Sequence, residues 1–225
     1  IRDLVRSRGL GDVYKRQLLG QNVDSYLWYG GGPKMDFKKL SDIQKASSIN
    51  FAQLLEKVAL VSPEMRIRFS TSHPQDMTDE VLKIMAKYEN ICDYIHLPVQ
   101  SGNSRILKLM NRGYSREWYI ERIDAIKRII PGCAISQDII LGFFSVTVVV
   151  HKDTLTLMDY VKFDYGFMFK YSERPNTKAA RKFEDDVPEE IKSRRQTEII
   201  EKQRAHSMMH NQSRVGKTFK VLVEG

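Results

Sequence analysis

Cysteine is scarce in this sequence, whose 225 residues include only Cys92 and Cys133. Neither cysteine has a second one beside it in a CxxC pattern, which excludes a disulfide framework and a metal knuckle built on paired cysteines. We interpret both thiols as buried core side chains, and we expect a cytoplasmic protein because free thiols persist in that compartment.

Long hydrophobic runs are also missing. No apolar segment reaches the roughly 18 residues that a membrane-spanning helix needs. The chain does not open on the basic and then apolar segment of a secretory signal either. We therefore expect no membrane partner.

The composition that remains is that of a globular protein with an excess of positive charge. Hydrophobic residues make up 42% and charged residues 28%, and the net charge is +8. The length suits one large α/β domain with a small appendage, or two equal domains. The charge permits a polyanionic partner without requiring one.

The stretch Tyr94–Arg112 predicts one βα unit. Apolar residues alternate with polar ones up to Gln100, a polar turn follows at Ser101–Asn103, and apolar residues then return at helical spacing. Pro98 removes a ladder donor and predicts a bend or bulge just before the turn. Gln100, Ser101 and Asn103 should face a ligand, because α/β folds bind ligands at the carboxyl ends of their strands.

Strand and helix patterns alternate at least five times along the chain. This rhythm predicts a parallel sheet, either open and doubly wound or closed as a complete or partial βα barrel. We take residues 24–50 as a long surface loop, with Thr78 or Asp79 as the cap of one helix. The predicted strands end or run at Leu18–Asn22, Met65–Ser70, Ala134–Leu141 and Tyr165–Tyr171, and the predicted helices are Phe51–Val61, Asp76–Tyr88, Trp118–Ile130 and Asp153–Phe163.

The sequence changes character after Thr177. Asp185–Arg214 is a long, highly charged helical segment, which we interpret as a solvated connecting helix in preference to a nucleic-acid-binding face. His206 and His210 lack a further ligand nearby and are taken as surface residues. Thr218–Val223 alternates as a strand.

Six turns in order along the chain carry a family resemblance. These motifs are Leu18–Val23, Arg68–Pro74, His96–Gly102, Met110–Arg112, Asp138–Phe143 and Tyr171–Pro175. Together they resemble the radical S-adenosylmethionine methylthiotransferases, and within them the MiaB-type branch that modifies tRNA.

The resemblance implies a partial (βα)6 TIM-like barrel of the radical SAM type over residues 18–176. A charged connecting helix over 177–214 and the first strand of a small RNA-binding β domain (TRAM) over 215–225 would follow. The implied reaction adds a methylthio group to C2 of N6-isopentenyladenosine near the tRNA anticodon. Its cofactors are S-adenosylmethionine and two [4Fe-4S] clusters, one held by a CxxxCxxC loop. The implied partner is tRNA, and we expect a monomer.

Three features depart from the family pattern. The chain has no CxxxCxxC, so we expect it to be unable to ligate a cluster and to be inactive as an N- and C-terminally truncated fragment. Asp12–Gln17 is what GAT GTG TAT AAG AGA CAG encodes, the end of a sequencing-library transposon, so residues 1–17 are taken as a residual helix plus a non-native junction. Residues 146–150 carry four valines where the family has acids. This predicts a longer strand or a late helix start.

The resemblance also suggests roles for polar residues at strand ends. The cofactor-binding candidates are Gln21, Asn22, Ser72, Gln100, Ser101, Arg112 and Asp138, and the substrate-binding candidates are His73 and Arg174. Arg112 would pair with the cofactor carboxylate, and Arg174 would meet tRNA phosphates.

Capping or turn formation is the alternative role for each candidate residue. Two other functions of the whole chain stay open. One is a related methylthiotransferase acting on a ribosomal protein, although Arg174-Pro175 favours the tRNA branch. The other is a non-catalytic RNA-binding module.

Overall fold

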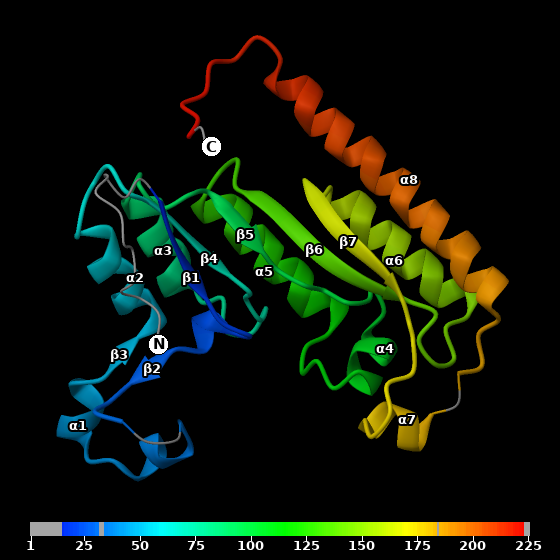
Figure 1. The fold of residues 1–225 in the computed structure, drawn as a ribbon, viewed down its shortest axis with the longest axis horizontal. Helices are drawn as coiled ribbons and strands as arrows, with labels where there is room; N and C mark the ends of the chain where they lie inside the picture. The colour runs from blue at the N-terminus through cyan, green and yellow to red at the C-terminus, as the bar shows by residue number, and fades with distance from the viewer. Residues whose placement is uncertain (1–14, 32–33, 184, 223–225) are drawn as a thin grey trace.

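The computed structural model describes residues 15–31, 34–183 and 185–222, so most of the predicted junction segment lies outside it. Within this part of the chain, five parallel strands form the centre of the molecule (Figure 1). They are β1 (Lys15–Leu19), β4 (Arg66–Ser70), β5 (Tyr94–His96), β6 (Ala134–Leu141) and β7 (Tyr165–Lys170). The predicted α/β fold with parallel strands is therefore confirmed.

The strands follow one another in the order of the chain. β1 pairs with β4, and β5, β6 and β7 pair in sequence. Two hydrogen bonds join these groups, because Ile67 N donates to Asn90 O at 2.8 Å and Cys92 N donates to Ile67 O at 2.9 Å. The result is an open, incomplete barrel whose edges are β1 and β7. Lys15–Gln17, expected to lie in a junction, pair with Arg66–Arg68 at the first edge.

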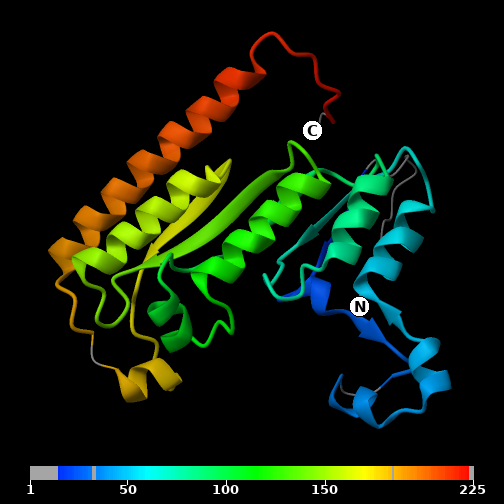
Figure 2. The same cartoon turned by 180° about the vertical axis from the view of Figure 1, so that it is seen from behind.

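Helices cover one face of the sheet, as the reverse view shows (Figure 2). They are α2 (Phe51–Ala59), α3 (Asp79–Lys87), α5 (Arg116–Ile129) and α6 (Val148–Val161), with the short α4 (Ser104–Leu109) after β5. Thr78 caps α3 through Val81 N, which confirms one of the two predicted caps. The opposite face of the sheet is the hollow interior side of the incomplete barrel, which we call the inner face.

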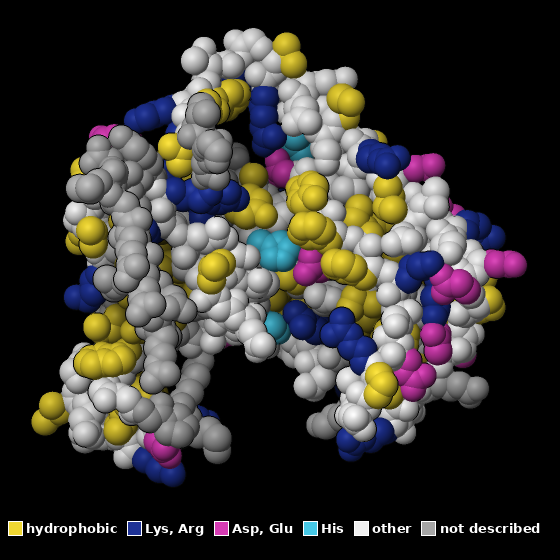
Figure 3. Space-filling view, viewed as in Figure 1, with side chains coloured by type: hydrophobic (Ala, Val, Ile, Leu, Met, Phe, Trp, Pro, Cys, Tyr) yellow, Lys and Arg dark blue, Asp and Glu magenta, His cyan; other side chains and the backbone are white. Residues whose placement is uncertain are grey.

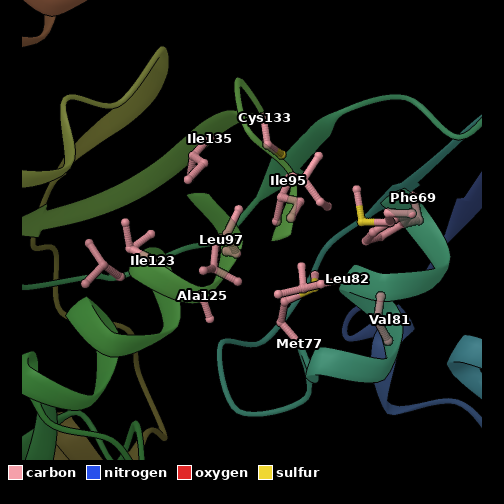
Figure 4. Packing of buried hydrophobic residues seen from close by; sticks show 14 of the residues in the cluster. Phe69, Met77, Val81, Leu82, Ile95, Leu97, Ile123, Ala125, Cys133 and Ile135 are labelled. Carbon is pink, nitrogen blue, oxygen red and sulfur yellow. The ribbon is translucent and has the colours of Figure 1, made fainter. Parts of the chain in front are cut away.

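The hydrophobic core lies between the sheet and these helices. Ile95 and Leu97 are fully buried there, together with Phe69, Leu82 and Ile123 (Figure 4). Cys133 is buried in this core as predicted. Cys92 lies just before β5 and is only half-buried. For Cys92 the prediction of a core thiol is therefore wrong.

The bulge predicted at Pro98 is present. His96 pairs with Ser136, whereas Gln100 bridges to Ile139, so the first strand has one residue more than the second between these pairs. Gln100 has φ 71°, in the left-handed region that residues other than glycine rarely adopt. Its backbone is held there, since Gln100 N donates to Asp138 O at 2.8 Å and Ile140 N donates to Gln100 O at 2.9 Å.

Gly102, in the turn after β5, touches the backbone of α6 directly, at the second turn of that helix. A Cβ atom at this position would lie 2.5 Å from the Cα of Thr154 and 2.6 Å from the carbonyl oxygen of Asp153. Thr154 Oγ1 also accepts a hydrogen bond from Gly102 N at 3.0 Å. Only glycine allows this approach of two backbones.

Residues 24–50 are not the long loop that we expected. They contain η1 (Val23–Ser25), β2 (Leu27–Trp28), η2 (Lys34–Lys39), α1 (Asp42–Ala46) and β3 (Ile49–Asn50). β2 and β3 pair as an antiparallel ribbon, and a capping box between Ser41 and Gln44 begins α1. Short elements held by local caps are hard to see in a hydrophobicity pattern.

The valine-rich segment neither extends β6 nor delays α6, so that expectation is wrong. Thr147 caps the helix by accepting from Val150 N, and α6 begins at Val148, earlier than the predicted Asp153. Val150 is buried against Ile106 and Phe143, which offsets the poor helix preference of valine. Val148 and Val149 remain exposed.

After β7 the chain forms α7 (Lys178–Lys182) and the long α8 (Glu189–Arg214). α8 is not a solvated helix, because it packs along β7 and α6 and buries Arg195, Ile199 and His206. The expectation of a surface His206 is therefore also wrong. Side chains of α8 donate hydrogen bonds to backbone carbonyls along the outer edge of β7. Gln196 Nε2 donates to Met168 O at 2.9 Å, Ser207 Oγ donates to Asp164 O at 2.7 Å, and Lys192 Nζ donates to Tyr171 O at 3.4 Å.

The described residues beyond α8, 215–222, contain no strand, which contradicts the strand predicted at Thr218–Val223 over that range. A strand needs a neighbour for its backbone groups, and this segment pairs with none of the described strands. No helix in the described part of the chain is both long and apolar enough to cross a membrane.

We predict that Gly102→Ala destabilises the protein by about 3 kcal/mol, since the added methyl group meets backbone atoms that cannot move aside. Urea unfolding followed by circular dichroism measures this. Gly20→Ala is the matched control, because a Cβ there would meet its neighbours at an ordinary 3.5 Å. Equal stability of the two variants would contradict the close approach.

Candidate functional site

A cleft lies at the carboxyl ends of β5, β6 and β7. It consists of two adjoining cavities, of about 500 and 640 Å³, that share Gln100, Ile140, Tyr171 and Ala179. Volumes of this size suit small-molecule ligands. The strand ends supply the floor, and α4 and α7 supply the sides.

Four of the predicted site residues meet in this cleft. Gln100, Asp138 and Arg174 line its first cavity, and Arg112 lines the second. Gln100 is aimed by the bulge that Pro98 introduces, and Asp138 lies on β6 directly opposite Phe167 of β7. The cleft therefore combines a carboxylate, an amide and guanidinium groups beside apolar side chains.

Ser101 does not line the cleft. Its side chain is buried, and its Oγ accepts from Asn103 N at 3.3 Å. Asn103 in turn caps α4 and donates from Nδ2 to Asp153 Oδ2 at 2.6 Å. The contacts of Ser101 are those of turn formation, the alternative role considered for it.

The candidates after β1 and β4 form a second cluster. Asn22 donates from Nδ2 to Asp76 Oδ2 at 2.5 Å, and its Oδ1 accepts from His73 N at 3.2 Å. Ser72 is buried beneath this turn, and Gln21 is exposed beside it. The amide of Asn22 therefore organises the turns, and this cluster does not share the cleft cavities.

Tyr114 connects the two clusters. Its ring lies 5.6 Å from that of His73, edge to face, and its hydroxyl donates to the carbonyl of Val99 at 3.2 Å. The same hydroxyl accepts from Arg112 Nε at 3.3 Å. Burial, together with the nearby Arg112 charge, lowers the pKa of His73, so its imidazole stays neutral at pH 7.

Asp24 is a site residue that the sequence did not reveal. Its Oδ1 shares the His73 N–H at 3.2 Å, while Oδ2 is buried without a hydrogen-bond partner among the described residues. Burial raises the pKa of Asp24 to about 7, despite the hydrogen bond from His73. A carboxyl group that is protonated near neutral pH thus lies at the base of the second cluster.

A chain of polar side chains crosses the inner face below the cleft. Ser136 Oγ lies 2.6 Å from Tyr94 Oη and 2.8 Å from His96 Nδ1, and His96 Nε2 lies 3.5 Å from Asp138 Oδ2. The guanidinium of Arg68 lies 4.7 Å from the centre of the Tyr94 ring. Alternation in β5 and β6 could have located these residues, because every second residue of a barrel strand faces the interior.

Basic side chains surround the cleft. Figure 3 shows lysine and arginine side chains gathered around the hollow of the inner face, with acidic and histidine side chains among them. The basic residues that line the two cavities are Arg105, Lys108, Arg112, Lys170, Arg174 and Lys182. This rim favours an anionic ligand or partner.

The cysteines of the chain do not fit an iron–sulfur cluster. Cys92 and Cys133 precede β5 and β6, at the end of the strands opposite the cleft. Burial raises the pKa of the Cys133 thiol to about 12, whereas cluster ligation needs thiolates. No group of three possible metal ligands occurs in the part of the chain that the structure describes.

Comparison with known proteins gives a consistent family. Residues 10–157 match the family model of the Radical SAM superfamily. The chain is 61% identical over 207 residues to the tRNA-2-methylthio-N(6)-dimethylallyladenosine synthase of Christiangramia forsetii, and 58% identical over 218 residues to that of Flavobacterium johnsoniae. These alignments cover 92% and 97% of the chain but 43% and 45% of the relatives, so the chain spans under half of their length.

A solved structure supports the fold. Coproporphyrinogen III oxidase from Escherichia coli, a radical SAM enzyme by its title, is similar with a TM-score of 0.55 over 75% of this chain and 38% of its own. The sequence identity is 19%, so this likeness concerns the fold alone.

Asp24 predicts an unusual dependence of stability on pH. Its pKa is about 7 when folded and near 3.8 when unfolded, so the folded state binds the proton more tightly and stability falls as the pH rises between these values. Asp24→Asn, which keeps an acceptor for His73 N, should stabilise the protein at pH 8 by on the order of 4 kcal/mol and have little effect at pH 4. Urea unfolding at both pH values measures this.

The matched control is Asp42→Asn, at a fully exposed carboxylate in α1. It should change stability little and equally at both pH values. A pH-independent effect of Asp24→Asn would contradict a proton held by Asp24.

Proposed function

The chain belongs to the Radical SAM superfamily, and from this premise we propose that its cleft binds S-adenosylmethionine and an unpaired loop of tRNA. The reaction served is the methylthio modification of N(6)-dimethylallyladenosine in that loop. The observation that carries the proposal is the convergence of Gln100, Asp138, Arg112 and Arg174 at one end of the parallel sheet, inside a basic rim. Two relatives with 61% and 58% identity carry the name of that activity.

The cleft residues fit S-adenosylmethionine chemically. The Asp138 carboxylate and the Gln100 amide offer acceptors for the cofactor's amino and hydroxyl groups, while Ile140 and Phe169 offer apolar contact. Arg112 is placed in the second cavity, where a guanidinium can pair with the cofactor's carboxylate. The cofactor supplies the reactive adenosyl group, and the chain's own residues bind and orient it. His73 and Asn22, in the cluster after β1 and β4, line neither cavity.

The basic rim suits the tRNA backbone. Arg174 and Lys170 lie at the end of β7, and Lys182 lies at the end of α7, so phosphates of a loop entering the cleft would meet positive charge on that side. Arg174-Pro175 favours tRNA over a ribosomal protein as the substrate. We place the protein in the cytoplasm, where tRNA is modified.

Because its cysteines do not fit a cluster, we propose that the chain binds its ligands without completing the reaction. Aerobic or anaerobic reconstitution with iron and sulfide should leave it colourless.

The second candidate function, an RNA-binding module without a cofactor, is favoured by the same basic rim. Titration with the cofactor separates the two.

We predict that the chain binds S-adenosylmethionine and that Asp138→Asn weakens binding about tenfold, because a charge-assisted hydrogen bond to the cofactor is lost. Isothermal titration calorimetry measures this, with Asp42→Asn as the control. Tight tRNA binding with no cofactor binding would leave the RNA-binding module as the function.

For tRNA, we predict that Arg174→Ala weakens binding of an anticodon stem-loop several-fold and lowers the slope of affinity against salt by about one ion. Fluorescence anisotropy at several salt concentrations gives both quantities. Arg128→Ala, an exposed arginine on the outer helix α5, should change neither. If both variants behave alike, the rim is not the RNA contact.

A further inference from the structure

β7 carries a row of aromatic side chains on the inner face. Tyr165, Phe167 and Phe169 pair in register with Ser136, Asp138 and Ile140 of β6, so they share the face of the polar chain described above. Their side chains are 54%, 45% and 52% exposed. The side chain of the intervening Met168 lies on the other face of the strand, and both Gly166 and Met168 are half-buried. We call Tyr165, Phe167 and Phe169 the aromatic ladder.

The rings of the ladder support one another. Tyr165 and Phe167 meet edge to face with centroids 5.1 Å apart, and Phe167 and Phe169 lie nearly parallel with centroids 6.3 Å apart. Behind them, the buried side chain of Gln137 packs against Gly166, so a side chain at position 166 would force Gln137 to move. The ladder is thus carried by a paired strand, and about half of the surface of each of its residues remains exposed.

The ladder extends from the cleft to a second cavity. Phe169 lines the first cleft cavity beside Gln100 and Asp138. Tyr165 and Phe167 line a separate groove of about 610 Å³ between β7 and α8. The ladder therefore borders both the cleft and the groove beside α8, and its aromatic surface is reached from either cavity.

Polar and cationic groups flank the aromatic surface. The His96 ring contacts Phe167 edge to face at 6.3 Å, and Asp138 lies opposite Phe167 on the neighbouring strand. Lys170 and Arg174 stand at the rim above the ladder. Aromatic faces, an edge acceptor and cations form the combination with which proteins bind single-stranded nucleic acid.

From this arrangement we propose that the aromatic ladder is a stacking surface for an unpaired RNA base, whose edge lies toward Asp138 and His96 and whose phosphates lie at the basic rim. The proposal rests on the RNA partner of the proposed function and adds the element that receives the base. A carboxylate acceptor favours bases with an exocyclic amino group, which are adenine, cytosine and guanine, over uracil.

The test compares Phe167→Leu and Phe169→Leu with the unchanged chain in binding a fluorescent single-stranded oligoadenylate, using anisotropy. Leucine keeps apolar volume and removes the aromatic face, so each variant should bind about tenfold more weakly. Binding of a duplex RNA of the same length should stay unchanged, since its bases are already stacked. Phe219→Leu, at an equally exposed phenylalanine outside the ladder, is the matched control and should bind as the unchanged chain does.

Circular dichroism and urea unfolding confirm that each variant is folded before binding is compared. If the ladder variants bind oligoadenylate normally, the ladder proposal is overturned while the proposed function stands. Loss of oligoadenylate and duplex binding together would mean a damaged rim and would also overturn it. Sedimentation that shows the unchanged chain pairing with a second copy, and the ladder variants failing to pair, would assign the ladder to a protein contact instead.

Discussion

The contact between Gly102 and the first turns of α6 is the constraint on which the cleft depends. It brings the helix backbone against the turn after β5, and Arg116 reinforces it by donating from Nη1 to the carbonyl oxygens of both Gly102 and Asp153. The turn is thereby fixed immediately after Gln100, which the Pro98 bulge has already rotated into the left-handed region. The side chain that lines both cavities is thus held by packing on one side and by β6 on the other.

The barrel is open and incomplete, and this exposes its inner face to ligands. A closed βα barrel fills its interior with side chains, whereas here the inner face carries a polar chain on β5 and β6 and uncovered aromatic rings on β7. The polar side chains that can bond the edge of a ligand and the aromatic side chains that can stack on its face therefore lie on adjacent strands of one sheet. The proposed RNA base and the proposed cofactor would share this surface, with Asp138 between them.

Much of this arrangement could be predicted from particular residues. Alternation around Ile95 and Leu97, with Pro98 before a polar turn, located the central βα unit, its bulge and the position of Gln100 at the strand end. The start of α6 was mispredicted because propensity disfavours Val148 and Val149, while the Thr147 cap and the burial of Val150 decide the outcome. The environment of Asp24 could not be foreseen, since its pKa depends on burial by residues distant in sequence. The packing of α8 against β7 and α6 was not predicted from the sequence for a related reason. Its buried positions include Lys192, Arg195, Gln203 and His206, so it shows no apolar stripe.

The hydrogen bonds from α8 side chains to backbone carbonyls set the alignment of α8 against β7. From Lys192 to Ser207 the helix rises about 22 Å, and the carbonyls from Tyr171 back to Asp164 span about 23 Å of strand. The two elements run in opposite directions with matching lengths, so successive helix turns meet successive outward carbonyls. Inserting one residue inside this part of α8 would rotate every later side chain by about 100° and unpair those carbonyls together. The length of this part of α8 is therefore set by the strand beside it, and not by the helix alone.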